Sequence, residues 1–518
     1  MAPALRVAGI RTSAAALGIP ASWKAGSMDP AHADWAARLR AALVAADFTY
    51  ETVAAALGED AHRALGRNET LPGLRRTTSG SPLDTLVRLF LLQAPVTHEA
   101  AEGALPGLVD RLCNAGVLEQ SVGEVAARLD CRPYEADDTD LWVVSDLTPG
   151  LDGAPVRVGA EHVLGISSAS TSLAQLTMRE PVGRALDLGT GCGVQALHLA
   201  GHAASVVATD VNPRALWMTR LNAALNEVDV DVRDGSFFDP VAGERFDLIA
   251  TNPPFVISPA TGERLVYRDS GLPGDRVVEH IVRTGPDHLT DGGWLQVLAN
   301  WAIVEGRPWD ERLGSWLRAD CDALVVQRET LDPASYVELW LKDSGHHGGP
   351  DYAERYDTWL SWLEETGIEG VGFGWINVRL GGSGRHDLLE WPYDVEQPIG
   401  PAIHDWGEAV TTLARTSDDA LLAAHPVVRP DVRQETLGAP GEADPEVIVL
   451  RQQRGFRRAR TADTVEAGFV GASDGDLSTG QLLGALAGLL ERDEADLRGT
   501  YLPVVRELVG DGFLDIEG

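Results

Sequence analysis

The segment FDLIATNPPF, residues 246–255, places a set of chemically useful groups directly after an apolar strand. Proline lacks a backbone N–H and fixes φ, so the prolines at 253 and 254 end the strand in a rigid turn. The amide oxygen of Asn252 and the carbonyl of Pro253 are two acceptors that can hold both hydrogens of a planar nitrogen. Pro254 restrains that carbonyl, and Phe255 offers a flat apolar face for stacking. We predict that these four residues hold and activate an amide or aromatic amine nitrogen, although an arbitrary Asn-Pro-Pro tripeptide is by default a plain strand terminator.

A second segment, ALDLGTGCGVQALHLA at residues 185–200, is typical of a nucleotide-like cofactor site. An apolar strand ends in Asp187, three alternate glycines follow, and a helix begins. Glycine permits a tight turn and a close approach of the ligand, and the helix N-terminus offers unpaired N–H donors. We interpret the cysteine inside this turn as a small packing residue. The residues predicted to contact the cofactor are Asp187, Gly189, Thr190, Gly191, Cys192, Gly193, Asp210, Val211, Asp234, Gly235 and Ser236.

Acidic residues end the next two predicted strands as well. Asp210 follows Asp187 by 23 residues and is placed to accept hydrogen bonds from ribose hydroxyls. Asp234 ends the third strand, where a carboxylate suits an adenine amino group. The spacing GTGCG differs from the G-x-G-x-x-G of dinucleotide sites, and an acid at the first strand end would repel a pyrophosphate. It suits a cationic ligand, which favours S-adenosylmethionine.

Residues 160–305 resemble the class I S-adenosylmethionine-dependent methyltransferases, in the branch with an Asn-Pro-Pro-aromatic motif after the fourth strand. LDLGTGCG, ATDVNPRAL and FDLIATNPPFV carry the resemblance in order and spacing. The branch includes the release-factor glutamine methyltransferases, the ribosomal-RNA guanine and tRNA adenine methyltransferases, and the DNA adenine methyltransferases. The resemblance implies a Rossmann-like sheet of seven strands, S-adenosyl-L-methionine as the cofactor, and no metal. YRDSGLPGDRVVEHIVRTGPDHLTDGGWLQVL is similar to the glutamine-methylating members.

The methyl acceptor stays open at this point. We prefer a glutamine side chain of a protein partner, and an adenine or guanine amine of RNA or DNA is the first alternative, since an extruded base would stack on Phe255. A small-molecule acceptor is also compatible with the motifs. From another class, a regulatory protein that only senses the cofactor would have no use for the acceptor pair at 252–253.

Between about residues 155 and 380 strands alternate with helices, which is typical of an α/β doubly wound sheet. The last two of seven strands are expected to form an antiparallel pair. The predicted strands are RALDLGT, SVVATDV, VDVRDGS, FDLIATNP, GWLQVLANW, CDALVVQRE and EGVGFGWINVRL, with the helix YAERYDTWLSWLEETG between the last two.

The flanking segments predict accessory domains. Residues 29–153 read as helices followed by two strands, EVAARLDCRPY and TDLWVVSDL, an order that resembles a winged-helix module, for which we favour docking over DNA binding. Residues 154–382 form the methyltransferase domain, and 383–518 an α+β accessory domain whose tail, two helices and a strand, is also winged-helix-like. EWPYDVEQPIGPAIHDWG is expected to be irregular and RQETLGAPGEADPE a loop. Residues 1–28 are expected to be a disordered leader, with Met28 an alternative start.

Composition sets broad limits. The chain has 518 residues, 44% of them hydrophobic, and no apolar run of about 18 residues, so we expect no membrane span and a cytoplasmic protein. Its four cysteines are widely spaced, which suggests neither a zinc site nor a disulfide framework. A net charge of -34 weakly favours a protein or small-molecule substrate over nucleic acid. RQQRGFRRAR, residues 451–460, is the one basic cluster; it either pairs with the acidic body or touches a phosphate backbone.

Overall fold

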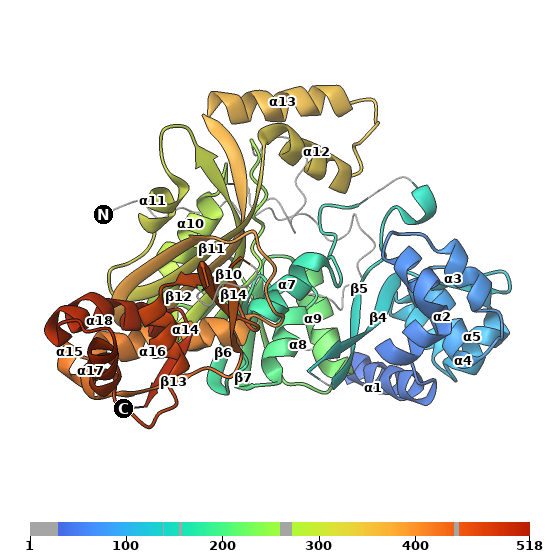
Figure 1. Cartoon of the computed structure of the whole chain (residues 1–518). Helices are drawn as coiled ribbons and strands as arrows, with labels where there is room; N and C mark the ends of the chain where they lie inside the picture. The colour runs from blue at the N-terminus through green and yellow to red at the C-terminus, as the bar shows by residue number, and fades with distance from the viewer. Residues whose placement is uncertain (1–29, 138, 155–157, 260–271, 440–444, 518) are drawn as a thin grey trace.

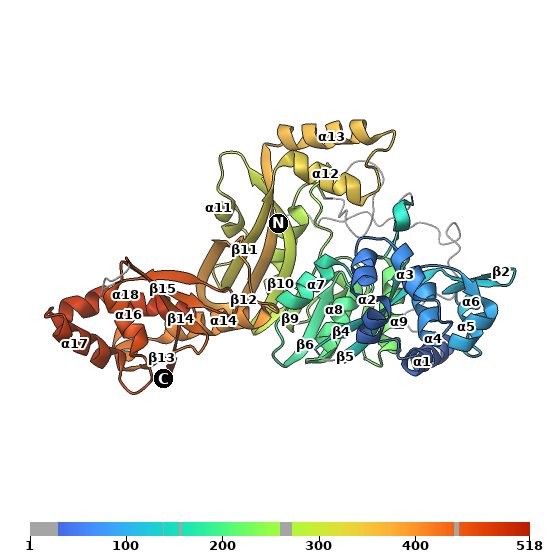
Figure 2. The same ribbon diagram turned by 45° about the vertical axis from the view of Figure 1, so that its right-hand side comes forward.

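The computed structural model describes residues 30–137, 139–154, 158–259, 272–439 and 445–517. The predicted leader at 1–28 lies outside these residues, as does the first part of the segment beginning YRDSGLPG. The described residues form a central sheet domain with a helical N-terminal part and a C-terminal part at its two ends (Figures 1 and 2). A pair of helices, α12 (Pro333–Asp343) and α13 (Tyr352–Glu365), stands above the sheet in both views.

The central sheet has seven strands in the order β8-β7-β6-β9-β10-β12-β11, which confirms the predicted mixed sheet. Neighbouring strands run parallel from β8 to β10, and β12 is antiparallel to both of its neighbours. Because the parallel strands share a direction, the carboxyl ends of β8, β7, β6 and β9 lie along one edge in that order. The strands are β6 (Val182–Leu188), β7 (Ala203–Asp210), β8 (Asp231–Asp234), β9 (Phe246–Thr251), β10 (Leu289–Val304), β11 (Cys321–Leu331) and β12 (Ile368–Glu390).

Helices cover both faces of this sheet. Leu173 of α7 and Ile403 of α14 belong to the core on one face, together with residues of α8. Val278 of α10 and Leu313 of α11 belong to the core on the other face. The helices are α7 (Ser168–Leu176), α8 (Val194–Ala200), α9 (Pro213–Leu225), α10 (Arg276–Thr284), α11 (Trp309–Gly314) and α14 (Gly400–Arg415).

Strand β12 is longer than predicted, because the chain folds back beyond Leu380. Gly381 and Gly382 have φ values of 87° and 98°, and a Cβ on Gly382 would lie 1.9 Å from Oδ2 of Asp322. The buried Asp322 carboxylate accepts hydrogen bonds from the backbone and hydroxyl of Ser383, both at 3.0 Å. Residues 386–390 then run along the second edge of β11, with Ala323 in register with both 378 and 386. The predicted strand end at residue 380 was therefore wrong.

The connection between β11 and β12 contains α12 (Pro333–Asp343) and α13 (Tyr352–Glu365). Only α13 was predicted from the sequence. Tyr336, Leu341 and Leu363 from these helices form a core with Ile257 and Ala302. The helix pair is thus packed against the segment that follows β9.

The N-terminal part consists of short helices around a small sheet ordered β1-β3-β2, together with a separate ribbon of β4 and β5. Residues 124–134 were predicted as one strand, which is wrong: Arg128 separates β3 from β4, and the two belong to different sheets. Ser81 caps α4, accepting from the backbone of Asp84 at 3.1 Å, with Pro82 at the first helical position. The elements are α1 (Pro30–Ala45), α2 (Tyr50–Leu65), α3 (Leu71–Arg76), α4 (Pro82–Leu86), β1 (Val96–Thr97), α5 (His98–Ala104), α6 (Val109–Asn114), β2 (Leu118–Ser121), β3 (Glu124–Ala127), β4 (Leu129–Ala136) and β5 (Thr139–Asp146).

Asn222 of α9 and Asn226, which caps the C-terminus of this helix, join this part to the central domain. Asn226 accepts from the backbone N–H of Trp142 and donates to its carbonyl, both at 2.8 Å. Asn222 makes the same pair of bonds with Val144, also at 2.8 Å each. The two asparagine side chains therefore satisfy backbone groups along the outer edge of β5, where a neighbouring strand would otherwise pair. The apolar cores of the two parts are continuous.

The C-terminal part begins earlier in regular structure than predicted. EWPYDVEQPIGPAIHDWG was predicted to be irregular, but α14 starts at Gly400 with Pro401 in its first turn, where proline is well tolerated. RQETLGAPGEADPE was predicted to be a loop, but Val432–Leu437 is strand β14, paired with β15. The other elements are α15 (Asp418–Ala423), β13 (His425–Val428), β15 (Val447–Gln452), β16 (Ala459–Ala462), α16 (Thr464–Gly471), α17 (Thr479–Leu489), α18 (Glu494–Gly510) and β17 (Leu514–Glu517).

Within the described ranges, none of the helices combines the length and the apolar character that crossing a bilayer requires.

Candidate active site

The glycine turn after β6 has the open geometry that the sequence predicted. Gly189, Gly191 and Gly193 have φ values of 77°, 58° and 89°, a region that favours glycine. Added Cβ atoms on Gly189 and Gly191 would meet nothing within 4 Å, whereas one on Gly193 would lie 3.1 Å from Thr219 Cγ2. The first two glycines therefore keep room for a ligand, and the third allows close packing of α9 against the turn.

Asp187 stabilises this turn through hydrogen bonds. Its side chain is buried, and Oδ2 accepts from the Thr190 hydroxyl at 2.6 Å and from the Ala196 N–H at 3.0 Å. Burial raises the pKa of Asp187 to about 7, although both hydrogen bonds act in the opposite direction. The carboxylate thus holds the turn and the first residues of α8 together, and a cation bound nearby would favour its charged form.

Asp210 lies at the end of β7, next to the glycine turn. Its two oxygens accept from the backbone of Gly191 at 2.9 Å and of Asn212 at 2.8 Å. Burial raises the pKa of this half-buried carboxylate, and the neighbouring Asp234 carboxylate raises it further. The backbone carbonyl of Asp210 also receives the N–H of Gly235 at 3.1 Å, so the ends of β7 and β8 are directly joined.

The remaining predicted cofactor residues frame the same edge. Val211 is 51% exposed, which is unusual for a valine beside a sheet, and Asp234 is exposed as well. Gly235 has a φ of 151°, and a Cβ there would lie 2.5 Å from the ring of Pro240. Ser236 is half-buried directly after it. An apolar side chain and a carboxylate at neighbouring strand ends suit a flat heteroaromatic ring with an amino group.

Cys192 fills a packing position, as interpreted from the sequence. Its side chain is 4% exposed within the apolar core, and burial raises the pKa of its thiol to about 12. Its backbone carbonyl accepts from Nδ2 of Asn222 at 2.7 Å. Through that bond the asparagine that binds β5 also holds the glycine turn.

The Asn-Pro-Pro-Phe turn lies at the end of β9, beside the glycine turn. Thr251, the last residue of the strand, donates its hydroxyl to the carbonyl of Leu188 at 2.7 Å. Asn252 is half-buried, but its Oδ1 atom is buried and has no hydrogen-bond donor in the part of the chain that the structure describes. Pro253 is buried and Pro254 half-buried. The turn therefore presents an unused acceptor beside a rigid backbone, next to the glycine turn.

Aromatic side chains of α12 contact the Asn-Pro-Pro-Phe turn and the residues that follow it. The ring of Phe255 meets the ring of Trp340 edge-on, with centroids 6.4 Å apart. Two residues later, the N–H of Ile257 donates to the hydroxyl of the fully buried Tyr336 at 2.8 Å. Both contacts tie α12 to the segment that carries the motif.

The sequence did not single out several residues that shape this site. Asn212, Thr219 and Asn222 look like ordinary polar positions of a helix, and Tyr336 and Trp340 belong to a helix that was not predicted. The hydroxyl of Thr219 donates to the carbonyl of Gly191 at 3.0 Å. For Thr219 and Asn222, the sequence offers one local indication of a role in the site: they are polar residues on the predicted helix that follows Asp210.

The basic cluster at 451–460 is largely ion-paired. Arg454 and Arg457 are exposed, and no acidic partner of their side chains is found among the described residues. The other three arginines support the first alternative, pairing with the acidic body. The pairs are Arg451 with Glu435 at 2.8 Å, Arg458 with Asp511 at 3.4 Å and Arg460 with Glu507 at 2.9 Å.

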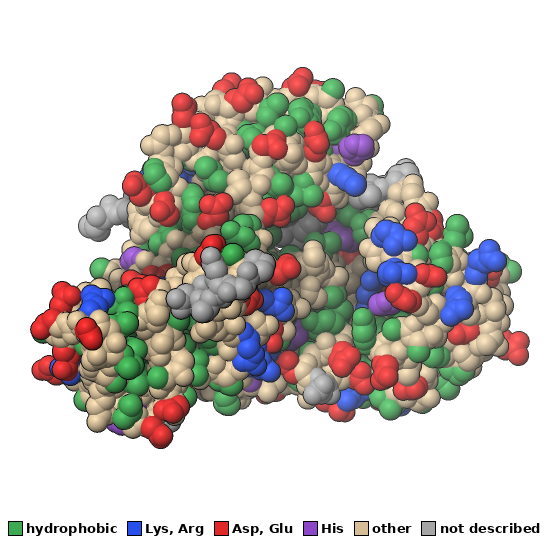
Figure 3. Space-filling view, in the orientation of Figure 1, with side chains coloured by type: hydrophobic (Ala, Val, Ile, Leu, Met, Phe, Trp, Pro, Cys, Tyr) green, Lys and Arg blue, Asp and Glu red, His purple; other side chains and the backbone are tan. Residues whose placement is uncertain are grey.

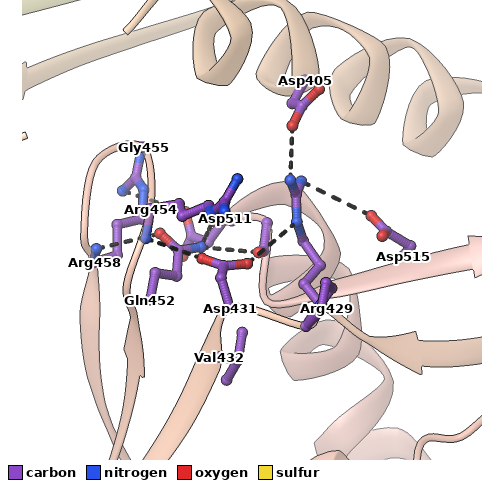
Figure 4. A network of polar contacts seen from close by, with 12 residues as sticks. Asp405, Arg429, Asp431, Val432, Gln452, Arg454, Gly455, Arg458, Asp511 and Asp515 are labelled. Carbon is purple, nitrogen blue, oxygen red and sulfur yellow. Dashed lines mark hydrogen bonds and ion pairs between the residues drawn. The ribbon is translucent and has the colours of Figure 1, made fainter. Parts of the chain in front are cut away.

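The neighbouring Arg429 forms a similar network (Figure 4). Its guanidinium points between Asp405, at 2.8 Å, and Asp515, at 3.9 Å, and so joins α14 to β17. The carboxylate of Asp431 accepts the backbone N–H of Arg454 at 3.2 Å, which holds the base of the β15–β16 turn. These contacts give most of the cationic groups here a structural use.

Comparison with protein families identifies the central part of the chain. Residues 165–307 match the methyltransferase small domain, so the chain contains a methyltransferase domain, and the resemblance drawn from its motifs is confirmed. Residues 45–128 match a domain of unknown function, DUF7059.

Curated relatives agree with this family over part of their length. The release factor glutamine methyltransferase of Xylella fastidiosa is 35% identical over 131 residues, 23% of this chain and 47% of that protein. The ribosomal RNA small subunit methyltransferase C of Erwinia tasmaniensis is 29% identical over 192 residues, 36% of this chain and 51% of that protein. The chain therefore spans about half the length of these relatives.

Among solved structures, the 16S rRNA N2 G1207 methyltransferase of T. thermophilus, in complex with AdoMet and guanosine, is similar at 16% identity. The match covers 45% of this chain and 60% of that chain with a TM-score of 0.27. Overlap of that extent supports no statement about the function of this chain.

Proposed function

We propose that the chain is an S-adenosylmethionine-dependent N-methyltransferase whose acceptor is a planar amide or amine nitrogen. The observation that carries the proposal is the buried Oδ1 of Asn252, which has no hydrogen-bond donor among the described residues. A buried acceptor without a partner destabilises the fold by roughly 1–3 kcal/mol, so its presence beside a glycine turn calls for a ligand that supplies the donor.

The residues at the strand ends fit the proposed cofactor. Gly189 and Gly191 leave open space, and the carboxylate of Asp210 stands at the next strand end with Val211 exposed beside it. Bound S-adenosylmethionine would supply a methyl group on a sulfonium; its transfer to nitrogen would break the S–C bond, leave a neutral thioether, and require one N–H proton to be released. The neutral amide of Asn252 near that cation avoids the charge repulsion that a lysine would create.

The residues of the turn orient the acceptor. Asn252 Oδ1 accepts one N–H of the reacting nitrogen and the Pro253 carbonyl accepts the other, which aims the lone pair away from both oxygens. Both acceptors also stabilise positive charge that develops on the nitrogen in the transition state. Phe255, held edge-on by Trp340, provides the face on which the planar group stacks.

A glutamine side chain in a protein partner is the acceptor we prefer. The glutamine methyltransferase among the relatives and the net charge of -34 support this choice. The N-terminal part, residues 29–153, which the sequence predicts to be winged-helix-like, would then dock the partner.

A base amine in RNA or DNA is the second candidate, and specific arginines favour it. Arg454 and Arg457 are exposed and unpaired within the described chain, and a relative methylates ribosomal RNA according to its name. Figure 3 shows Lys and Arg side chains on the lower parts at either side of a central hollow, interspersed with Asp and Glu side chains, which also spread over the lobe of α12 and α13.

Incubation with tritiated S-adenosylmethionine and cell extract tests the proposal and separates the candidates. Label that is lost on protease treatment supports a protein acceptor, and label that is lost on nuclease treatment supports a nucleic acid. The Asn252→Ala variant serves as the control for label that does not depend on the site. Equal label with both proteins, or none with either, contradicts the proposal.

A further inference from the structure

A second unpaired amide lies close to Asn252, on the neighbouring strand. Asn300 of β10 is 2% exposed, and its Nδ2 atom is buried without a hydrogen-bond acceptor in the described part of the chain. Asn300 lies outside the sequence motifs that predict the site. A buried donor without a partner is rare in folded proteins, so its presence needs an explanation.

Gln296 on the same strand shows how such an amide is normally accommodated. It is also fully buried and, four residues earlier on the strand, points to the same face. Its Oε1 accepts from the backbone of Met178 at 2.9 Å, and its Nε2 donates to the carbonyl of Leu176 and to Asn377, both at 2.9 Å. The described part of the fold therefore satisfies the Gln296 amide of this strand and leaves Nδ2 of Asn300 without an acceptor.

The register places Asn300 beside the Asn-Pro-Pro-Phe turn. Thr251 pairs with Val297, so position 298 would stand opposite Asn252, and Asn300 is two residues further along on the same face. With a rise of about 3.3 Å per residue and a strand spacing of about 4.8 Å, the two Cα atoms are roughly 8 Å apart. That distance is short enough for one small planar group to contact both side chains.

The other neighbours of Asn300 also connect it to the Asn-Pro-Pro-Phe turn. Asn300 pairs with Phe373 across the β10–β12 ladder, and the ring of Phe373 packs against Tyr336 with centroids 5.9 Å apart. Tyr336 in turn packs against Trp340, which contacts Phe255. Asn300 thus lies at the base of the aromatic cluster that borders the predicted acceptor site.

We propose that Asn300 is a second hydrogen-bonding residue of the acceptor site, an inference that rests on the proposed function. Its Nδ2 donates to an acceptor atom of the substrate that is adjacent to the reacting nitrogen, while Asn252 Oδ1 accepts from that nitrogen. The pair is selective for a planar group that carries an N–H beside an oxygen or ring nitrogen, as in a carboxamide. An isolated amine without such a neighbour would leave Asn300 unpaired in the complex and would be rejected.

The first test measures stability in matched variants. Asn300→Leu replaces an unpaired amide with an apolar group of similar size, so its thermal midpoint should equal or exceed that of the wild type. Gln296→Leu leaves three satisfied partners without a bond, so its midpoint should fall by several degrees. A fall of similar size in Asn300→Leu would show that Asn300 is structural and would overturn the proposal.

The second test measures transfer of tritiated methyl groups over a dilution series of cell extract, with protease and nuclease arms to identify the source of the acceptor. Asn300→Leu and Asn300→Asp both lack the donor and should raise the apparent KM roughly tenfold, with unchanged affinity for S-adenosylmethionine by calorimetry. Wild-type transfer by Asn300→Asp would overturn the proposal. Undiminished transfer by Asn252→Ala would instead refute the proposed function, so the two failures are distinguishable.

Discussion

Asn222 connects the N-terminal part to the glycine turn, and replacing it by leucine should affect both. The fully buried side chain forms three hydrogen bonds, two with the backbone of Val144 and one with the carbonyl of Cys192. Leucine has a similar size but neither a donor nor an acceptor. Asn222→Leu therefore leaves three buried backbone groups without a partner.

The expected magnitude follows from these three groups. Each unsatisfied backbone group destabilises the fold by about 1–3 kcal/mol, so the free energy of unfolding should fall by at least about 3 kcal/mol. The Cys192 carbonyl belongs to the turn that we propose binds the cofactor. Losing one net hydrogen bond of about 1 kcal/mol there should weaken the binding of S-adenosylmethionine about fivefold.

Asn226→Leu is the matched control for this prediction. Asn226 makes the same two bonds with Trp142, but its third bond goes to the carbonyl of Asn222 within α9. Urea denaturation should show a loss of stability in both variants, and calorimetry should show weaker cofactor binding in Asn222→Leu alone. Equal affinities in the two variants, or unchanged stability in either, would refute the reasoning.

Three further predictions concern the cofactor edge and the acceptor face. Asp210→Ala should weaken the binding of S-adenosylmethionine in calorimetry, and an unchanged dissociation constant would contradict the proposed ribose contact. Burial raises the pKa of Asp187 to about 7, from about 3.9 in the unfolded chain, so the folded state binds this proton more tightly. The contribution of Asp187 to the free energy of unfolding should therefore fall as the pH rises from about 4 to 7 and stay level above pH 7. Urea denaturation of Asp187→Asn at pH 5 and pH 8 should lack this fall, and a fall as large as in the wild type would assign it to another group. Trp340→Ala removes the edge contact with Phe255, which contributes about 0.5–1.5 kcal/mol. The rate of methyl transfer should therefore drop up to about tenfold, while the affinity for S-adenosylmethionine stays unchanged. A parallel loss of that affinity would show that Trp340 is a structural residue.

The central sheet was predictable because its signals are local. Each buried strand is a short apolar run, and each of the first strands ends in a glycine or proline turn that can be read from the sequence. Helix α14 was missed because its first residues belong to the segment EWPYDVEQPIGPAIHDWG, which was expected to be irregular, although the first turn of a helix tolerates a proline such as Pro401. The fold-back of β12 depends on Asp322, which lies 61 residues before the Ser383 that it binds, so no local sequence pattern predicts it.

The candidate site was predictable to a similar degree. Asn252 and the glycines belong to contiguous motifs whose residue types have a direct chemical reason. Asn300 lies on another strand and Trp340 on a helix distant in sequence. Strand register places Asn300 near Asn252, and side-chain packing places Trp340 against Phe255. Among the described residues, Nδ2 of Asn300 has no hydrogen-bond acceptor, while the side chain of Gln296 makes three hydrogen bonds; this difference follows only from tertiary structure.

The most direct test of the central claim is transfer of the methyl group itself. Wild-type protein and Asn252→Ala are loaded with tritiated S-adenosylmethionine, mixed with extract, and followed in a single turnover. We expect both proteins to bind the cofactor within a few-fold of each other, and the variant to transfer label at least about 100-fold more slowly, as for the loss of one preorganised hydrogen-bonding group. Equal transfer rates, or no transfer by the wild type to any fraction, would contradict the account.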